Sequence, residues 1–254
     1  MKPYIICFLT VAPAAEFYAF AAQLQNDTYS VYVVVDDNKR PLTIEPSDAH
    51  TLKGNIIQLD ERVCAQRGFY GSLLYNTKPC ARDKALYFLA TTPEPFQHAW
   101  LIEEDVFVPS TGTLAALDAK YPTGDLLCKE FHHLLHTPRD FQPGWHWPWL
   151  KAQIHCPLPW AATMICAARL SAALIRVIST YAATHHRLFL DEALFPTLAL
   201  QAKLDIVCIQ ELNHLTFNEN TTTDVQMIQK THLYHPVKNM AMHNLYREFM
   251  ASAF

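Results

Sequence analysis

Continuous apolar runs alternate with amphipathic segments near the start of the chain. Tyr4 to Thr10 and Tyr29 to Val35 are largely unalternating and rich in β-forming residues, which is typical of strands buried on both faces of a parallel sheet. Between them, Phe17, Phe20 and Leu24 recur at helical spacing and predict a helix with one apolar face. This order predicts a β-α-β unit at the start of an α/β sheet.

The same alternation continues toward the C-terminus. Further short strands are predicted at 55–59, 99–103, 125–128 and 204–209, and helices at 80–89, 113–120, 169–181, 191–198 and near the C-terminus. Residues 131–160 show no clear period, and a long irregular segment of this kind is usually functional. Because no repeat or linker interrupts the pattern, we predict a single domain over residues 1–254: a mixed, mainly parallel sheet flanked by helices.

Three consecutive acids follow an apolar run. Ala99 to Val108 carries Glu103, Glu104 and Asp105. An unpaired buried carboxylate is costly, so this pattern favours a strand whose end opens into a site where acids meet a cation such as a divalent metal. A strand that ends in a solvated acidic turn is the alternative.

Charged residues also follow the second strand and begin a helix. Asp36 and Asp37 come directly after a strand, at the sheet edge where α/β proteins bind ligands, although an Asx-capped turn is the alternative. Arg82, Asp83 and Lys84 lie near the start of the helix at 80–89. Cations there suit a bound phosphate, which helix N-termini also attract. A cluster of surface charges is the alternative.

The second half of the chain offers aromatic and acidic candidates. Trp145, Trp147 and Trp160 lie in the irregular segment. Aromatic rings stack on sugars, although the same rings could form a small core under a loop. Asp191 and Glu192 precede a helix, where they are either site residues or an N-cap with a first-turn acid.

Three histidines in the same segment could form a zinc site. On a helix, His132 and His136 would share a face, but His133 replaces the Glu of an H-E-x-x-H motif. A zinc hydrolase is therefore a minor alternative.

Composition narrows the class of protein. The chain is 50% hydrophobic and 17% charged, with net charge -4 and no basic run, which argues against nucleic acid as a partner. With 6 Gly, it has neither a G-x-G-x-x-G motif nor a P-loop.

Seven scattered Cys without a C-x-x-C pair indicate reduced thiols in a cytoplasmic protein, with a Cys64–Cys80 bridge as the alternative. No apolar run reaches the ~18 residues of a transmembrane segment, and residues 1–15 fit a strand better than a signal peptide.

The order of these motifs resembles that of glycosyltransferases of the GT-A fold. Glu103-Glu104-Asp105 stands in the place of the Asp-x-Asp motif of that class, although here it is Glu-x-Asp. Asp191-Glu192 stands where many inverting members carry their catalytic base. The phrase Asp-Glu-Ala-Leu-Phe-Pro-Thr-Leu is also similar to the base-carrying stretch of the branching N-acetylglucosaminyltransferase and peptide xylosyltransferase group.

A C-terminal histidine extends this resemblance. His235, with Lys238, stands where a His often completes the metal shell of the family. The resemblance implies that Mn²⁺ or Mg²⁺ is held by Asp105, Glu103 and His235. We expect Glu104 to point to the opposite face and to be dispensable for the metal. Within the branching group, metal is not always required, so metal dependence is less firmly implied than the motif suggests.

The resemblance also implies a reaction and its substrates. A sugar would move from a nucleotide-sugar, in view of the family a UDP-sugar, to a hydroxyl of a glycan, lipid-linked or protein acceptor. Residues 1–125 would bind the donor and 126–254 the acceptor. The implied donor contacts are Thr10, Asp36, Asp37, Arg82, Asp83, Lys84, Glu103 and Lys238.

The remaining implied roles concern catalysis and the acceptor. Glu192, beside Asp191, would deprotonate the acceptor and cause inversion, and the three tryptophans would shape the acceptor side. A nucleotidyltransferase is one alternative, although Val11-Ala12-Pro13-Ala14 is not the Gly- and basic-rich loop that such enzymes normally carry. A non-catalytic carbohydrate-binding protein on the same fold is another.

Overall fold

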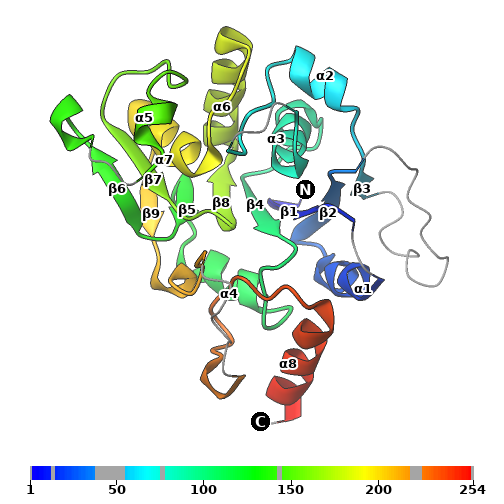
Figure 1. The fold of residues 1–254 in the computed structure, drawn as a ribbon. Helices are drawn as coiled ribbons and strands as arrows, with labels where there is room; N and C mark the ends of the chain where they lie inside the picture. Colours follow the sequence, from blue (N-terminus) through cyan, green and yellow to red (C-terminus); the bar gives the residue numbers. More distant parts are fainter. Residues whose placement is uncertain are drawn as a thin grey trace.

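The apolar runs form one seven-stranded sheet in a computed structural model of the chain (Figure 1). The structure describes residues 2–12, 15–37, 55–74, 78–141, 145–217 and 225–252. The strands of the sheet are β1 (Tyr4–Thr10), β2 (Tyr29–Val35), β3 (Ile56–Ile57), β4 (His98–Glu103), β5 (Leu126–Cys128), β8 (Ala167–Ser171) and β9 (Ile206–Cys208). A separate two-stranded sheet pairs β6 (Phe131–Leu135) with β7 (Trp160–Thr163).

Strand order in the main sheet is β3-β2-β1-β4-β8-β5-β9. β1 runs parallel to β2 and β4, whereas β8 runs antiparallel to β4 and β5. The predicted mixed, mainly parallel α/β sheet is therefore confirmed. Because Thr10 pairs with Val35, and Leu9 with Glu103, three strands end at the same edge. In sheets of this kind that edge is the usual place for a ligand.

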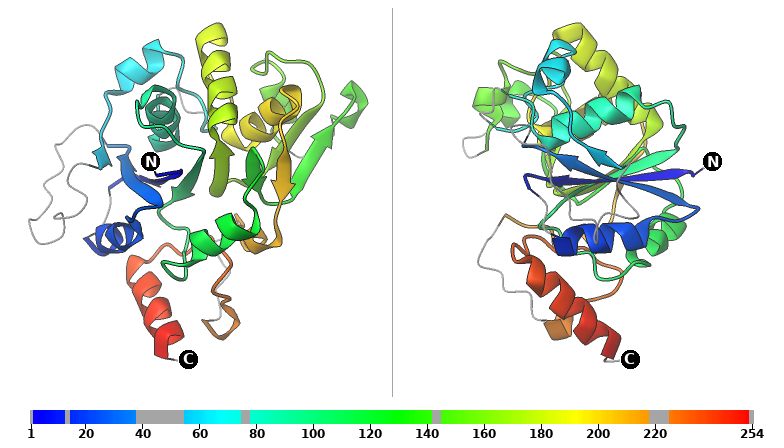
Figure 2. Two further views of the ribbon diagram at one scale, coloured as in Figure 1. Left: turned by 180° about the vertical axis from the view of Figure 1, so that it is seen from behind. Right: turned by 90° about the vertical axis from the view of Figure 1, so that its right-hand side faces the viewer.

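Helices cover both faces of the sheet (Figure 2). One face carries α2, α3 and α6, and the other carries α1 and α4, with α8 packed beyond α1. The helices are α1 (Ala15–Leu24), α2 (Glu61–Gln66), α3 (Ala81–Thr91), α4 (Thr113–Lys120), α5 (Trp147–Leu150), α6 (Ala172–His185), α7 (Asp191–Gln201) and α8 (Met240–Ser252). Short 3₁₀ turns span Pro138–Asp140, Gln210–Leu212 and Val225–Met227.

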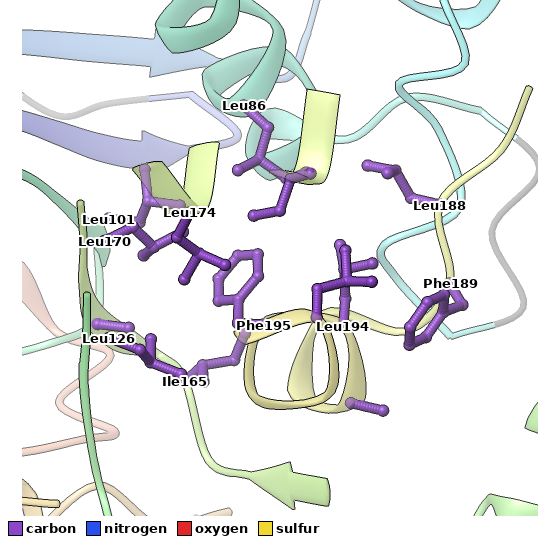
Figure 3. Close-up of a cluster of buried hydrophobic side chains, with 14 of the residues drawn as sticks. Leu86, Leu101, Leu126, Ile165, Leu170, Leu174, Leu188, Phe189, Leu194 and Phe195 are labelled. Carbon is purple, nitrogen blue, oxygen red and sulfur yellow. The ribbon is translucent and has the colours of Figure 1, made fainter. Parts of the chain in front are cut away.

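The strands are apolar on both faces because each face meets helices. In β1, Ile5 and Cys7 join one buried cluster, while Ile6 and Phe8 join the other. Figure 3 shows part of the first cluster, in which side chains of the sheet, α3, α6 and α7 meet around Phe195. A fully buried side chain of this size stabilises the fold by roughly 1.5–3 kcal/mol.

A buried polar network fixes α4 against the sheet. The Asp118 carboxylate accepts hydrogen bonds from Tyr29 Oη at 2.5 Å, Trp100 Nε1 at 3.2 Å and Arg169 Nη1 at 2.6 Å. Arg169 Nη2 also donates to the carbonyl of Tyr121 at 2.7 Å. Since both charges are buried, each depends on the other for its compensation.

The helix predicted at 169–181 is wrong at its start. Arg169 and its neighbours belong to β8, and α6 begins only at Ala172. The Ser171 side chain accepts a hydrogen bond from the Leu174 amide at 3.1 Å, so this residue caps the helix. The prediction failed because β8 is buried on both faces, so its apolar residues continue the helical spacing of α6 toward the N-terminus.

Two further observations concern the cysteines and the helices. All seven cysteines have free thiols, so the Cys64–Cys80 bridge is not formed. Within the described residues, we find no helix with the length and apolar character needed to cross a bilayer.

Candidate active site

A cleft opens where β1, β2 and β4 end. It has a first lobe of about 470 Å³ and an adjoining second lobe of about 330 Å³. Six residues line both lobes: Leu73, Arg82, Glu103, Asp105, Asp191 and Lys238. Thr10, Asp36 and Glu104 line the first lobe alone, whereas Glu192 and His235 line the second. The candidates predicted from distant parts of the sequence therefore meet in one place.

The end of β4 meets His235 between the lobes. His235 Nε2 lies 3.2 Å from Asp105 Oδ1 and 3.6 Å from Glu103 Oε2. Backbone pairing fixes this meeting, because the Val237 amide donates to the Asp105 carbonyl at 2.8 Å. His235 Nδ1 donates to the Thr216 carbonyl at 2.7 Å, which directs Nε2 toward the acids. Metal-binding histidines are commonly oriented by such a bond.

Asp105 and His235 stabilise each other's charged forms. Burial alone would raise the pKa of Asp105, but the hydrogen bond and charge of His235 outweigh it and lower that pKa. Burial opposes the charge on His235, but Asp105 and Glu103 raise the pKa of its imidazole. A cation is therefore favoured at this point of the cleft.

The donor atoms at this point suit a divalent ion. Glu103 and Asp105 offer carboxylate oxygens, and His235 offers one ring nitrogen directed at them. Carboxylates suit Mg²⁺ and Mn²⁺, and an imidazole is also compatible with transition metals. The Cys166 thiol lies in the same group: its Sγ and ligand atoms of Glu103 and His235 all lie within 4.8 Å of one another.

The sequence did not identify Cys166 as a candidate. It forms no ligand-spacing motif with another Cys or His, and it reaches the site through the antiparallel pairing of β4 with β8. The signal that could have found it is a cysteine just before a strand that pairs with the acidic strand.

Arg82 joins the two halves of the cleft. Its guanidinium donates to Asp191 and to Glu103 Oε1, the latter at 2.5 Å. The side chain is 6% exposed, and Asp83 and Lys84 are buried with it. The alternative of a surface charge cluster is therefore excluded.

Asp83 and Lys84 are buried supports and do not line either lobe. The Asp83 carboxylate accepts from the amides of Ser72 at 3.1 Å and Cys80 at 3.0 Å, which caps the start of α3. Lys84 Nζ donates to the Asp36 carbonyl and lies 3.4 Å from its carboxylate. Their direct contact with a ligand, as first expected, is not supported, because both side chains are used inside the protein.

Asp191 and Glu192 begin α7, next to the second lobe. The N-cap is Leu190, so Asp191 is the first helical residue, and its Oδ1 accepts from the Glu192 amide at 2.8 Å. Burial raises the pKa of Asp191 to about 6, against the opposing charge of Arg82. Burial, and then the charge of Asp191, raise the pKa of Glu192 to about 8. Among described residues, no donor lies within hydrogen-bond distance of the Glu192 carboxylate.

Two acidic residues differ from the sequence prediction. Glu104 does not point away from the site: it lines the first lobe and accepts a hydrogen bond from the Thr10 hydroxyl. The strand ends at Glu103, so strict alternation of faces no longer applies at the next residue. Asp37 lies outside the lining of both lobes, and its carbonyl accepts from Gln58 Nε2 at 2.8 Å.

The three tryptophans do not line the cleft. Trp147 and Trp160 are 1% and 6% exposed and pack into the main core, and Trp145 packs on Trp147 with 4.5 Å between ring centroids. The prediction that these tryptophans shape the acceptor side is therefore wrong. They form the aromatic core that was its alternative. Phe217 lines the second lobe; it is 68% exposed and was not singled out by the sequence.

The histidine cluster is arranged on a strand. His132 and His133 belong to β6 and His136 follows its end, so the helical pairing of His132 with His136 is not formed. In the described part of the chain, no group of three close metal-ligating side chains includes them. The zinc hydrolase alternative has no support.

Solved structures match most of the chain at low identity. Mouse xyloside xylosyltransferase 1, in its apo form, is 12% identical, with 93% of this chain and 98% of that chain covered and a TM-score of 0.47. The galactosyltransferase LgtC, in complex with donor and acceptor sugar analogues, is 10% identical, with 97% and 95% covered and a TM-score of 0.48. The 4-diphosphocytidyl-2C-methyl-D-erythritol synthase of Anaerococcus prevotii is 9% identical, with 98% and 96% covered and a TM-score of 0.44.

Comparisons based on sequence give no match. No family model matches the chain, and neither does any curated protein. The first two of these structures are glycosyltransferases by name.

Proposed function

We propose that this protein is a glycosyltransferase that moves a sugar from a nucleotide-sugar to a hydroxyl acceptor. The observation that carries the proposal is the joining of the two lobes at Glu103 and Asp105, with a cation-favouring site there and the Glu192 carboxylate beside it. One lobe can then hold the donor and the other the acceptor. The bond to be exchanged would lie where the lobes meet.

The first lobe suits the nucleotide part of the donor. It lies at the carboxyl ends of β1 and β2, and its volume is in the range of small-ligand sites. The Asp36 carboxylate can accept hydrogen bonds from ribose hydroxyls, and Lys84 holds this residue in place. Lys238, which lines both lobes, supplies a positive charge for the diphosphate.

The diphosphate leaving group needs neutralisation. Asp105, Glu103 and His235 would hold Mn²⁺ or Mg²⁺, and the bound ion supplies Lewis-acid stabilisation of the charge that develops on the diphosphate. Arg82 keeps Glu103 and Asp191 in place through two ion pairs. A UDP-sugar is the donor we propose, from the resemblance in the motif order.

Glu192 is the proposed general base. As the acceptor oxygen attacks the anomeric carbon, the bond from that carbon to the diphosphate breaks and the hydroxyl proton passes to Glu192. A carboxylate whose pKa is raised toward neutrality suits this proton transfer. A single direct displacement of this kind inverts the configuration of the anomeric carbon.

A turnover assay tests the proposal. The protein is incubated with a panel of nucleotide-sugars and hydroxyl acceptors, and released nucleoside diphosphate and glycosylated product are measured. We expect turnover with at least one uridine donor and its loss in Glu192→Gln, while Glu248→Gln, an exposed change on α8, retains it. Equal turnover by Glu192→Gln and the native chain would contradict the assignment of the base.

A further inference from the structure

The Cys166 thiol lies against two of the proposed metal ligands. Its Sγ and ligand atoms of Glu103 and His235 lie within 4.8 Å of one another. The residue is 6% exposed, and its exposed part faces the second lobe. A thiol in this position is chemically unlike the oxygen donors of Glu103 and Asp105, because sulfur is a soft ligand.

Backbone pairing places Cys166 directly opposite Glu103. The Glu103 amide donates to the Cys166 carbonyl at 2.9 Å, which extends the β4–β8 pairing by one step. Residues directly opposite in an antiparallel pair project to the same face of the sheet. Glu103 and Cys166 are therefore presented together to whatever occupies the site.

The distances around His235 match those within a coordination shell. With metal–ligand bonds of about 2.0–2.3 Å, neighbouring donor atoms in a tetrahedral shell lie roughly 3–4 Å apart. His235 Nε2 lies 3.2 Å from Asp105 Oδ1 and 3.6 Å from Glu103 Oε2, and ligand atoms of Glu103, Cys166 and His235 all lie within 4.8 Å of one another. The thiol therefore lies close to two of the three proposed ligands.

We infer that Cys166 is a thiolate ligand in this site and gives it a preference for borderline ions such as Zn²⁺ and Co²⁺ over Mg²⁺. The inference rests on the metal site of the proposed function. Arg82 already neutralises part of the charge on Glu103, so a thiolate restores negative charge to the donor set. Oxygen-only sites favour Mg²⁺ and Mn²⁺, whereas sulfur selects softer ions.

Cobalt binding tests the inference without any turnover. The full chain is freed of metal and titrated with Co²⁺, and absorption is followed for the sulfur-to-cobalt charge-transfer band in the near ultraviolet. We expect the band in the native chain and its loss in Cys166→Ser. The matched control is Cys208→Ser, which removes an exposed thiol of β9 and should retain the band.

Competition with Zn²⁺ supplies a second readout. We expect Zn²⁺ affinity to fall by about tenfold or more in Cys166→Ser, with Mg²⁺ affinity unchanged. If Cys166→Ser does not fold, Cys166→Ala, which removes the sulfur from this buried position without adding a hydroxyl, replaces it in both measurements.

Three outcomes overturn the inference: Co²⁺ that binds without the band, Co²⁺ that does not bind at all, and a band that persists in the Cys166 variants. They are separable from failure of the proposed function. Nucleotide-sugar turnover without a cobalt–thiolate band would reject only the role of Cys166. The band without any nucleotide-sugar binding would support the ligand and reject glycosyl transfer.

Discussion

Glu192 is the residue whose environment most directly links structure to chemistry. The residue is 9% exposed and lies beside Asp191, and burial and the charge of Asp191 together raise its pKa to about 8. The general base must be ionised to accept a proton, so kcat/KM should rise with pH and approach its plateau above about pH 8. In Glu192→Gln we expect kcat/KM to fall by about 10²–10⁴-fold and no longer to rise with pH. A pH–rate profile of both proteins measures this, and an unchanged rise in the variant would reject the base.

The same raised pKa has a consequence for stability. An unfolded glutamate ionises near pH 4.5, whereas folded Glu192 stays protonated up to about pH 8. Between these two pH values the glutamate is ionised in the unfolded state but protonated in the folded state, so the free energy of unfolding falls progressively as pH rises. The full destabilisation is present above the folded pKa. Glu192→Gln removes that cost.

We expect Glu192→Gln to raise the free energy of unfolding by about 1–3 kcal/mol at pH 8, with almost no gain at pH 4.5. Urea unfolding of the native chain and the variant at both pH values measures the difference. A gain of the same size at both pH values would point to packing and would contradict the assigned ionisation.

Elements are held together by buried polar groups as well as by apolar packing. Asp118 connects α4 to β2, β4 and β8 through Tyr29, Trp100 and Arg169. Asp118→Ala leaves the buried Arg169 charge without its partner, so we expect a loss of about 3–5 kcal/mol in the free energy of unfolding. Asp27→Asn, an exposed change, should stay within about 0.5 kcal/mol. Urea unfolding compares the two, and a similarly small effect at Asp118 would show that the network is not structural.

Periodicity predicted most elements, and it failed where two patterns overlap. The ranges of β1, β2 and α4 were predicted correctly, because each apolar run or helical spacing is compatible with only one type of element. The residues of β8 are buried on both faces and continue smoothly into α6, so the sequence carries no signal of the change apart from Ser171. Pairing of β6 with β7 depends on contacts across a long intervening segment, which local patterns do not contain.

At the scale of the whole molecule, the cleft combines residues that only the topology brings together. The acids at the end of β4 and at the start of α7 were identified from sequence because charge after an apolar run is locally visible. Burial could not be predicted from local pattern: Trp147 and Trp160 were expected at the cleft, yet both are buried in the main hydrophobic cluster, Trp147 from α5 and Trp160 from β7. Cys166 and Phe217 reach the cleft only through the fold.

Binding of a nucleotide-sugar is the central claim about the whole molecule. A ligand that binds the native state raises its apparent stability, by about 2.7 kcal/mol at a concentration of 100 times Kd. Thermal unfolding is measured with a panel of nucleotide-sugars, with and without Mn²⁺, for the native chain and for Asp105→Asn. We predict a rise in Tm with at least one uridine donor, larger with Mn²⁺ than without it, and loss of the Mn²⁺-dependent part in Asp105→Asn. No rise with any nucleotide-sugar under any of these conditions would contradict the account.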